Sequence, residues 1–453
     1  MNAAAALDPG HAITLSGSGR QATIVRFLGS GGQGAVYEIA EDGISLALKL
    51  YHPQTVKADP RLPMRLGRAI ALGAPDSGFL WPLDHAVVPG KSDLVGYVMP
   101  LREQRFVGMK RLITAPPDRV SPPLARRAIA CLLTAESFHK LHARGQCYQD
   151  VSFGNIFLDP DTGEVAVCDN DNVDVNGAPA AVYGTRKFMA PEIVRREALP
   201  STITDLYSMA VMFFYILMSW HPLDGRREHE TMILDGDAEF RLYGSSPLFL
   251  FDPTDPSNGP VEGVHEPIVR RWRSLSKAVR DLFIRAFTTG LAPDAGRRVL
   301  ETEWIDAFAT MRDTVLACPV CGYEHAADAD DADAAPERFA CIACGAAVPL
   351  PPSLRFGRGR LLLANGALLR ADRVGPVSGR ARNAIVGTVE SHPRDPAISG
   401  MRNLGKTPWT AAFVDGRTTP VLPGQAVLIE PGCRIGFGQE SGVCVAAPSG
   451  DAP

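Results

Sequence analysis

The chain lacks a long apolar run, a cluster of basic residues and a strong net charge. Its longest apolar stretch, Met209 to Trp220, is too short to cross a bilayer and indicates a buried helix, so we expect no membrane partner. With 46 basic and 50 acidic residues the formal charge is −4, which argues against a nucleic-acid partner. Met1 to Leu7 lacks the charged region and apolar core of a signal peptide, so we expect a cytoplasmic protein.

The nine cysteines are therefore not expected to form a disulfide framework, because disulfides are rare in the cytoplasm. A length of 453 residues exceeds one ordinary domain and predicts two or three. A hydrophobic content of 45% is typical of globular rather than disordered chains. Lysine is scarce and most basic positions hold arginine, which makes each lysine informative.

A glycine-rich turn is the first feature that points to chemistry. It joins two segments that alternate as strands, Ala22 to Leu28 and Val36 to Ile39, and it contains Gly29, Gly31, Gly32 and Gly34. Glycines have no Cβ, so their backbone N–H groups can approach phosphates closely. The turn is equally compatible with an ordinary hairpin. Lys49, on the apolar strand Leu46 to Leu50, favours phosphate binding, although a solvated lysine at a strand end is the alternative.

Further polar residues follow in a fixed order. Asp150 stands five positions before Asn155, and Asp169 ends the apolar run Val165 to Cys168. Taken singly, each aspartate is more simply explained as a turn residue, but their joint spacing with Lys49 favours a functional interpretation. The order is completed by the segment Gly184 to Glu192, which ends in Ala190-Pro191-Glu192, and by Asp205.

In this order the motifs resemble the eukaryotic-like Ser/Thr protein kinase family from about residue 20 to residue 312. The resemblance implies an α+β fold with a strand-rich N-lobe over a helical C-lobe and ATP between them. It implies that Asp150 accepts or orients the proton of the substrate hydroxyl and that Lys49 contacts the α- and β-phosphates. Asn155 and Asp169 would bind Mg²⁺ or Mn²⁺.

The resemblance also implies how the nucleotide and the scaffold are held. The glycine turn would cover the triphosphate, with Val36 above the adenine and Met99 and Leu101 at the hinge. Glu192 would pair with Arg298, for which Arg297 is the alternative. Asp205 would accept hydrogen bonds from the backbone of the catalytic loop, and Thr185 would contact the catalytic aspartate.

Two departures from the family pattern concern regulation. The segment between Leu50 and Gly96 contains no glutamate, so the expected helix Arg61 to Leu72 cannot supply the usual partner of Lys49. Asp59 or a phosphate would have to replace it. Gln149 stands where the family has an arginine that captures an activation-loop phosphate. Because Tyr183 and Thr185 are the only hydroxyl-bearing residues between Asp169 and Ala190, we do not expect activation by phosphorylation of this loop.

Two further departures concern the chemistry itself. Ser152 replaces the lysine of the catalytic loop, which removes a positive charge near the transferred group and should slow the transfer. Asn170 and Asp171 replace the last two residues of the D-F-G motif. Asn170 cannot fill the apolar slot of that phenylalanine, and Asp171 would either recruit a second cation or face solvent.

The set of Lys49, Asp150, Asn155 and Asp169 favours an active kinase. The competing interpretation is an ATP-binding pseudokinase scaffold, which the missing glutamate, Ser152 and Asn170 favour. A small-molecule kinase is a third alternative, against which the Ala190-Pro191-Glu192 segment argues because it is a protein-substrate feature.

Two C-x-x-C-G motifs follow the kinase-like region, and their cysteines are Cys318, Cys321, Cys341 and Cys344. The 19 residues between the two pairs lie within the range of zinc sites. Four thiolates and no open position predict a structural, tetrahedral Zn²⁺ site. His325 lies close in the sequence but is not needed as a ligand.

The remaining chain, residues 353–453, shows short apolar runs broken by Gly and Pro and predicts an all-β sandwich. It resembles a forkhead-associated (FHA) domain in the segments Met401 to Gly405 and Arg434 to Gly438. Arg358 is the candidate phosphate-binding arginine, although the expected S-x-x-H is absent, and a scaffold or docking domain is the alternative.

We therefore predict three units: a kinase domain (1–313), a zinc ribbon (314–352) and an FHA-like sandwich (353–453). Protein substrates are the expected partners. The arrangement also looks like bacterial kinases that accompany a PP2C-type phosphatase and a von Willebrand A-domain protein, so these are further expected partners. We also expect activity to be controlled by the C-terminal units or by a partner.

Overall fold

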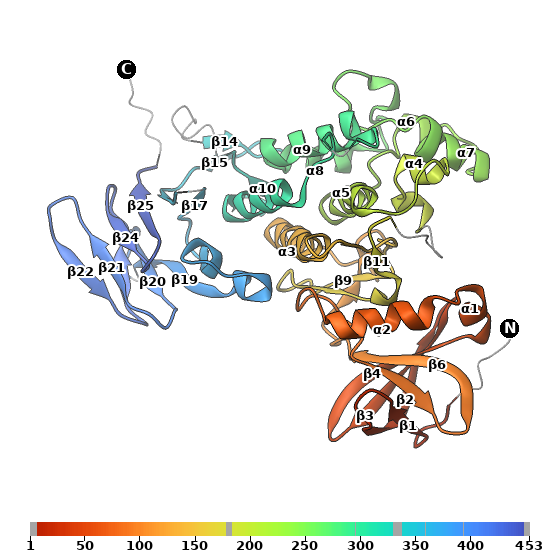
Figure 1. The fold of residues 1–453 in the computed structure, drawn as a ribbon. Helices are drawn as coiled ribbons and strands as arrows, with labels where there is room; N and C mark the ends of the chain where they lie inside the picture. The colour runs from red at the N-terminus through yellow and green to blue at the C-terminus, as the bar shows by residue number, and fades with distance from the viewer. Residues whose placement is uncertain are drawn as a thin grey trace.

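The N-terminal strands close into a barrel in the order β1-β2-β3-β4-β6-β5, seen at the bottom of Figure 1. The computed structural model describes residues 7–177, 184–294, 296–328, 338–357, 359–392 and 394–447. The barrel strands are β1 Ala12–Leu15, β2 Gln21–Ser30, β3 Gly34–Glu41, β4 Ile44–Tyr51, β5 Asp84–Val88 and β6 Lys91–Pro100. Apolar side chains of β3 and β4 alternate into the barrel core, which includes Tyr37, Ile39, Leu48 and Leu50.

Two helices, α1 Pro53–Ala58 and α2 Leu62–Leu72, follow β4 and lie between the barrel and the helical part of the molecule. Helix α2 begins with a proline in its first turn, which suits the fixed φ of that residue. Its buried residues Leu62 and Leu66 pack against Tyr51, Tyr97 and Met99 of the barrel. The core of α2 is thus continuous with the strand that carries Lys49.

The helical lobe is built around α3 Leu124–His142, α5 Thr202–Met218 and α10 Glu301–Asp313. Helix α5 is almost wholly buried and begins with a capping box in which Ser201 and Thr204 exchange hydrogen bonds. The other helices are α4 Pro191–Val194, α6 Arg226–His229, α7 Gly236–Phe240, α8 Glu266–Ser274 and α9 Lys277–Phe287. Residues 224–264 are rich in Gly, Pro and Asp, a composition typical of loops, yet they contain the short helices α6 and α7. No helix within the described residues is long and apolar enough to cross a membrane.

Short strand pairs at the base of this lobe carry the polar motifs. They are β7 Val107–Gly108 with β9 Ile156–Leu158 and β10 Val165–Val167, and β8 Gln146–Cys147 with β11 Asp174–Val175. Strand β9 begins directly after Asn155, and β10 ends two residues before Asp169. The two motifs therefore lie at neighbouring ends of one antiparallel pair.

Two hairpins follow α10, namely β12 Val315–Ala317 with β13 Glu324–Ala326, and β14 Arg338–Ala340 with β15 Ala347–Pro349. The rest of the chain forms two sheets. One contains β17 Arg360–Leu362, β16 Ser353–Arg355, β25 Ser441–Val445, β24 Arg434–Gly436, β21 Trp409–Ala412 and β22 Thr418–Val421. The other contains β18 Leu368–Arg370, β19 Ile385–His392, β20 Asp395–Asn403 and β23 Ala426–Leu428. Residues from both sheets share one core, as in a β-sandwich.

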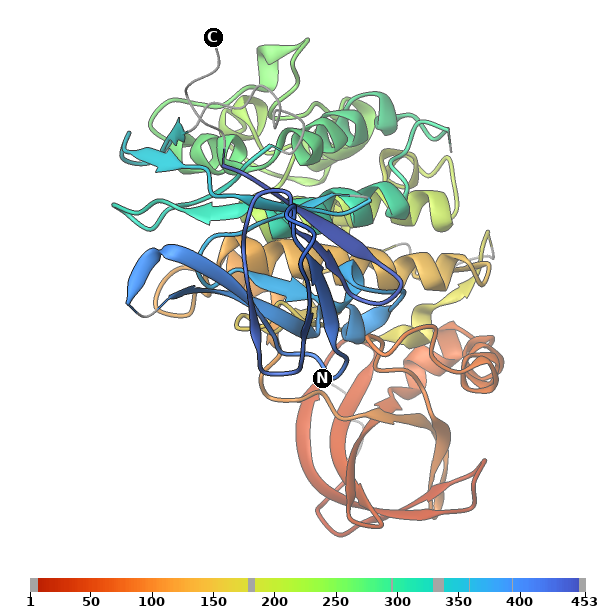
Figure 2. The same cartoon turned by 90° about the vertical axis from the view of Figure 1, so that its left-hand side faces the viewer.

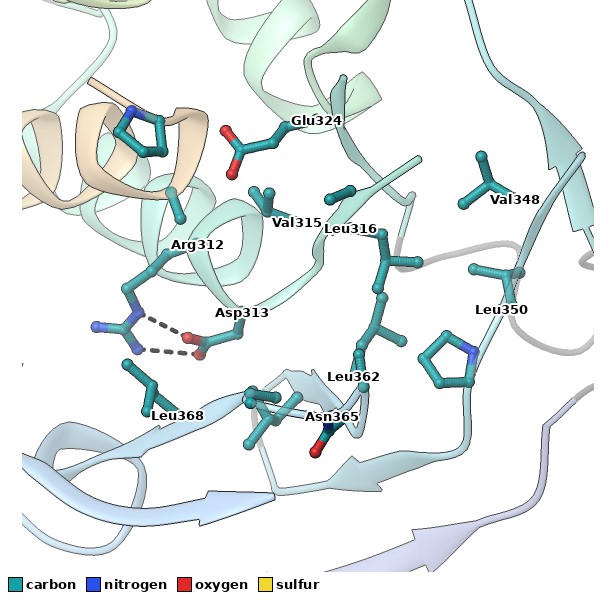
Figure 3. Close-up of a pocket in the computed structure, with 18 of the residues that line it drawn as sticks. Arg312, Asp313, Val315, Leu316, Glu324, Val348, Leu350, Leu362, Asn365 and Leu368 are labelled. Carbon is teal, nitrogen blue, oxygen red and sulfur yellow. Dashed lines mark hydrogen bonds and ion pairs between the residues drawn. The ribbon is translucent and has the colours of Figure 1, made fainter. Parts of the chain in front are cut away.

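The hairpins and the sandwich pack on the side of the helical lobe formed by α3 and α10 (Figures 1 and 2). A cavity of about 630 Å³ lies at this junction, and Figure 3 shows Val315 and Leu316 of the first hairpin on one wall and Leu362 and Leu368 of the sandwich on another. Arg312, at the end of α10, binds Asp313 at 2.6 Å and Asp372 of the sandwich at 3.1 Å.

Carboxylates from the first hairpin also cap two helices of the lobe. Glu324 accepts a hydrogen bond from the backbone N–H of Leu124, the first residue of α3. Asp328 accepts one from the backbone N–H of Lys277, the first residue of α9. In neither helix does the side chain of the N-cap residue accept a hydrogen bond from a backbone N–H. The hairpin thus satisfies backbone donors that the helices leave free.

Candidate active site

The glycine turn connects β2 to β3 and is closed by a hydrogen bond from Gly31 N to Gly34 O at 2.9 Å. A Cβ on Gly34 would lie 2.2 Å from the carbonyl oxygen of Leu50, so this position requires glycine. Gly29, Gly31 and Gly32 meet no atom within 4 Å in the direction of a Cβ. Val36 pairs with Lys49 in the register of β3 and β4. The turn therefore stands directly over the lysine strand, with open space beside three of its glycines.

Lys49 is buried, with 4% of its surface exposed, and it is held by three side chains. Its Nζ donates to Asp171 Oδ2 at 3.0 Å, to Asp169 Oδ1 at 3.2 Å and to Gln33 Oε1 of the glycine turn at 3.0 Å. Burial opposes the charged form of Lys49, but the two carboxylates outweigh it and raise the pKa of the lysine. Lys49 thus links the glycine turn to the loop that carries Asp169.

Asp171 is a correction to the sequence prediction, because it neither faces solvent nor stands open to a second cation. It is 1% exposed and accepts hydrogen bonds from Lys49, from the Tyr51 hydroxyl and from the Tyr97 hydroxyl, the last at 3.3 Å. Burial alone would raise its pKa, yet Lys49 and the Tyr51 hydroxyl hold the pKa of Asp171 below its ordinary value. Burial also raises the pKa of both tyrosines, so their hydroxyls stay protonated donors.

The expectation that Asp59 replaces the missing helix glutamate is wrong. Asp59 Oδ2 binds Arg65 Nη1 at 2.8 Å instead. Arg65 also donates from Nε to the backbone carbonyl of Asp171 at 2.8 Å, and Arg61 binds Asp174 at 3.3 Å. Helix α2 therefore contacts the loop after Asp169 through arginines rather than through a carboxylate.

Asp150 and Asn155 lie together on the catalytic loop. Asn155 Nδ2 donates to the Asp150 backbone carbonyl at 2.8 Å and to its carboxylate at 3.2 Å. The Thr185 hydroxyl donates to the other carboxylate oxygen of Asp150 at 3.1 Å, which is the contact that the resemblance implied. Gln149 and Asp169 both have left-handed backbones, with φ of 74° and 50°. Such conformations in residues other than glycine cluster at functional sites.

Buried ion pairs hold this loop from below. Asp205 accepts hydrogen bonds from the backbone N–H groups of Tyr148 at 2.5 Å and Gln149 at 3.1 Å, as expected. Glu192 binds Arg298 at 2.8 Å, so Arg298 is the partner and Arg297 is not. His142, which the sequence analysis did not single out, lies between Asp205 and Glu301. Although burial opposes its charge, these two carboxylates raise the pKa of His142 to about 9.

Asn170 is fully buried and occupies its slot with polar contacts. Its Nδ2 donates to the backbone carbonyls of Leu80 and Val167, both at 2.9 Å. The Asn170 amide thus links the loop after Asp169 to the segment before β5. The kinase family has an apolar phenylalanine at this position. Met99 faces the cluster between β4 and α2 and is 7% exposed, and Leu101 packs at the edge of the same cluster. Tyr183 lies outside the described residues.

The part of the chain that contains the catalytic loop matches a known protein family. Residues 108–286 match the family described as "Protein kinase domain". The chain contains a protein kinase domain. It is 29% identical over 193 residues to CBL-interacting protein kinase 4 of Oryza sativa subsp. japonica, which covers 38% of this chain and 41% of that protein. It is 29% identical over 141 residues to Serine/threonine-protein kinase sck2 of Schizosaccharomyces pombe, which covers 30% of this chain and 21% of that protein.

The matches span less than half the length of either relative. Among solved structures, the PknI kinase domain of Mycobacterium tuberculosis is similar to this chain with a TM-score of 0.42 and 19% identity, covering 67% of this chain and 98% of that one. The family match includes Asp150, Asn155 and Asp169, whereas Lys49 lies before it. The position of Lys49 in the kinase domain therefore rests on its contacts with Asp169 and Asp171.

Outside the kinase domain, the four cysteines of the two hairpins form one cluster. The Sγ atoms of Cys318, Cys321, Cys341 and Cys344 all lie within 4.8 Å of one another. Cys318 and Cys344 are separated by 3.7 Å, and Cys321 and Cys341 by 3.6 Å. Zn–S bonds of about 2.3 Å in a tetrahedron place sulfurs about 3.8 Å apart, so the donor set fits Zn²⁺. Gly322 and Gly345 have φ of 72° and 75°, which allows the tight turn after each pair.

The cysteine cluster also has backbone and histidine contacts. Backbone N–H groups of Cys321 and Val320 lower the pKa of the Cys318 thiol to about 7, whereas hydrogen bonds with the neighbouring thiols raise the pKa of Cys344. His325 Nε2 lies 3.3 Å from Cys341 Sγ, so this histidine supports a cysteine rather than joining the four. His325 is adjacent to Glu324, which caps α3. His325, which contacts the cluster, is thus adjacent in sequence to a residue that contacts the kinase domain.

In the sandwich, the asparagine of the FHA-like segment Met401 to Gly405 has a structural role. Asn403 is fully buried and donates to the backbone carbonyls of Thr407 and Val421 at 2.9 and 3.0 Å. Its Oδ1 accepts from Gly405 N at 2.9 Å. Arg358, the candidate phosphate-binding arginine, lies outside the described residues.

Proposed function

We propose that the chain is a protein kinase that transfers the γ-phosphate of ATP to serine and threonine hydroxyls of proteins, itself included. The observation that carries this proposal is the contact between Thr185 and the carboxylate of Asp150, which Asn155 also binds. A hydroxyl already lies at hydrogen-bond distance from the group that would receive a substrate proton. A substrate hydroxyl would take a similar place.

In the proposed reaction Asp150 accepts or orients the proton of the attacking hydroxyl. The hydroxyl oxygen bonds to the γ-phosphorus as the bond to the ADP oxygen breaks. Asn155 and Asp169 would hold Mg²⁺ or Mn²⁺, which would supply positive charge to neutralise the phosphates. Lys49 would present its ammonium to the α- and β-phosphates below the glycine turn, with Val36, Met99 and Leu101 around the adenine. Ser152 supplies no charge to the transferred group, so we expect slow transfer.

The alternative is an ATP-binding pseudokinase that acts as a scaffold through the hairpins and the sandwich. The missing helix glutamate favoured a pseudokinase, but Lys49 has a carboxylate partner in Asp171. The absence of the catalytic-loop lysine at Ser152 remains in its favour. The Thr185–Asp150 contact, on a segment typical of protein substrates, argues against a small-molecule kinase.

The C-terminal units belong to the same proposal. The four-cysteine cluster would hold structural Zn²⁺, and residues 314–352 and 353–453 would form a zinc ribbon and an FHA-like docking domain that control the kinase. Partnership with a PP2C-type phosphatase and a von Willebrand A-domain protein, and a cytoplasmic location, rest on the resemblance and on the composition alone.

The test is phosphate incorporation from labelled ATP into the full chain and into casein, with Mg²⁺ or Mn²⁺. Asp150→Asn should abolish incorporation, while the matched control Asp161→Asn, an exposed turn residue, should leave it unchanged. Equal incorporation in both variants would contradict the proposed role of Asp150. ATP binding without incorporation in the unmodified chain would favour the scaffold.

A further inference from the structure

Lys49 is buried and charged, and the proposed function does not say which carboxylate neutralises it. A buried cation needs a partner, since an unpaired charge in the interior is costly. In the kinase pattern this partner is a glutamate on the helix before β5, and the sequence from Leu50 to Gly96 contains none. Arginines stand at this place instead, namely Arg61 directly before α2 and Arg65 and Arg68 within it.

Asp171 meets the requirement from another element. Both of its carboxylate oxygens accept from Lys49 Nζ, at 3.2 and 3.0 Å, and the side chain is fully enclosed. Hydroxyls of Tyr51 on β4 and Tyr97 on β6 hold the same carboxylate from the barrel side. This set of donors orients Asp171 toward Lys49 and leaves no side of it open to solvent.

We propose that Asp171 is the residue that positions Lys49 for phosphate binding, in place of the helix carboxylate, so that the pair forms independently of where α2 lies. The inference rests on the proposed function in assuming that Lys49 binds nucleotide. Asp171 is two residues from Asp169, so the pair moves with the metal-binding loop. Displacement of α2 would break its arginine contacts to this loop, at Asp171 O and Asp174, and leave the Lys49–Asp171 bond in place.

The two carboxylates near Lys49 then have separate tasks. The side chain of Asp169 is 39% exposed, whereas that of Asp171 is 1% exposed. Asp171 neutralises the lysine, and Asp169 remains available to a metal ion. Without the charge of Asp171, Asp169 is the carboxylate still bonded to Lys49, and the lysine would compete with Mg²⁺ for it. The expected signature of losing Asp171 is therefore a raised requirement for Mg²⁺.

The experiment measures ATP binding to the full chain as a function of Mg²⁺, with kcat and KM for ATP in parallel. Asp171→Asn should raise the half-saturating Mg²⁺ concentration by about tenfold or more, as is usual when a residue supporting a metal ligand is lost. Asp174→Asn is the matched control, because Asp174 is also buried on this loop but pairs with Arg61, directly before α2, and with Arg68 of α2. It should loosen α2 and leave the Mg²⁺ requirement unchanged.

Two further variants guard against misfolding and against a merely structural effect. Tyr51→Phe keeps every charge and should shift the Mg²⁺ requirement in the same direction by a smaller factor. In a Lys49→Met background, adding Asp171→Asn should produce little additional shift, because Asp171 acts through the lysine. Shifts that add independently would overturn the inference.

An unchanged Mg²⁺ requirement in Asp171→Asn, or an equal shift in Asp174→Asn, would also overturn it. These binding measurements do not need phosphoryl transfer. A chain that binds Mg²⁺–ATP but transfers no phosphate would contradict the proposed function and still decide the role of Asp171. A chain that binds no nucleotide would overturn both.

Discussion

The caps that the first hairpin supplies to α3 and α9 predict that the stability of the kinase domain depends on Glu324 and Asp328. Helix α3 begins after Pro123, and α9 begins after Ser276, whose side chain caps nothing. Two carboxylates from residues 324–328 bind the first N–H of each helix instead. They also place negative charge at the positive end of each helix dipole.

The magnitude follows from the two contributions at each helix. Loss of an N-terminal cap costs about 1 kcal/mol, and loss of the charge at the helix end costs roughly 0.3–1 kcal/mol. Because the two caps act on different helices, the effects should add. The double variant Glu324→Ala/Asp328→Ala should therefore lose about 2.6–4 kcal/mol, which at about 2–4 °C per kcal/mol is roughly 5–16 °C in melting temperature.

The assay is thermal unfolding of the full chain followed by far-ultraviolet circular dichroism, which reports mainly on the helices. Each single variant should lower the melting temperature by about half of the double shift. Glu440→Ala, an exposed acidic residue in the β24–β25 hairpin, is the control and should leave it unchanged. If the double variant has the same melting temperature as the Glu440→Ala control, Glu324 and Asp328 do not stabilise the helices.

Four other outcomes follow from the same contacts. Removing zinc with a selective chelator, or Cys341→Ser, should lower the melting temperature at least as much as the double cap variant, since the metal would hold the hairpin that carries the caps. Because the pKa of His142 is raised to about 9, its contribution to the free energy of unfolding is full below about pH 6.5 and is lost as the pH rises through 9. His142→Gln should flatten this decline, which amounts to roughly 3 kcal/mol, in urea unfolding at a series of pH values. Arg298→Ala leaves Glu192 buried and unpaired and should cost about 3–5 kcal/mol in the same assay, whereas a loss below about 1 kcal/mol would contradict the pairing. Gly34→Ala would set a Cβ against the Leu50 carbonyl and should weaken ATP binding in a fluorescence titration, which unchanged binding would disprove.

Three groups of contacts could be predicted from the sequence, because each belongs to a recognisable motif. Asp150 and Asn155 stand five positions apart on one loop, and they contact each other. The contact of Thr185 with Asp150 was implied by the resemblance to the kinase family. The Glu192–Arg298 pair was implied by the resemblance to the kinase family, with Arg297 as the alternative. The four cysteines were expected to meet because each C-x-x-C pair brings two sulfurs together through one tight turn.

The features that could not be predicted depend on elements that meet only in the folded chain. Asp171 appeared to be a spare carboxylate, because nothing local shows that Tyr51 and Tyr97 would enclose it. His142 lies 63 residues before Asp205 and 159 before Glu301, so no local pattern marks it. The caps on α3 and α9 come from a hairpin whose most visible feature in the sequence is its cysteines. The helices within residues 224–264 could not be predicted from the sequence, because that segment is rich in Gly, Pro and Asp and the helices are short.

The most direct test of the central claim is phosphate transfer between copies of this chain. The unmodified full chain would be incubated with ATP, Mg²⁺ and an Asp150→Asn copy of distinguishable mass, and intact mass spectrometry would follow the copy. If the chain is a Ser/Thr protein kinase, the Asp150→Asn copy should gain phosphate on serine or threonine in the presence of the unmodified chain and none when incubated alone. A copy that gains no phosphate in either mixture, while the unmodified chain binds ATP, would contradict the proposed kinase activity.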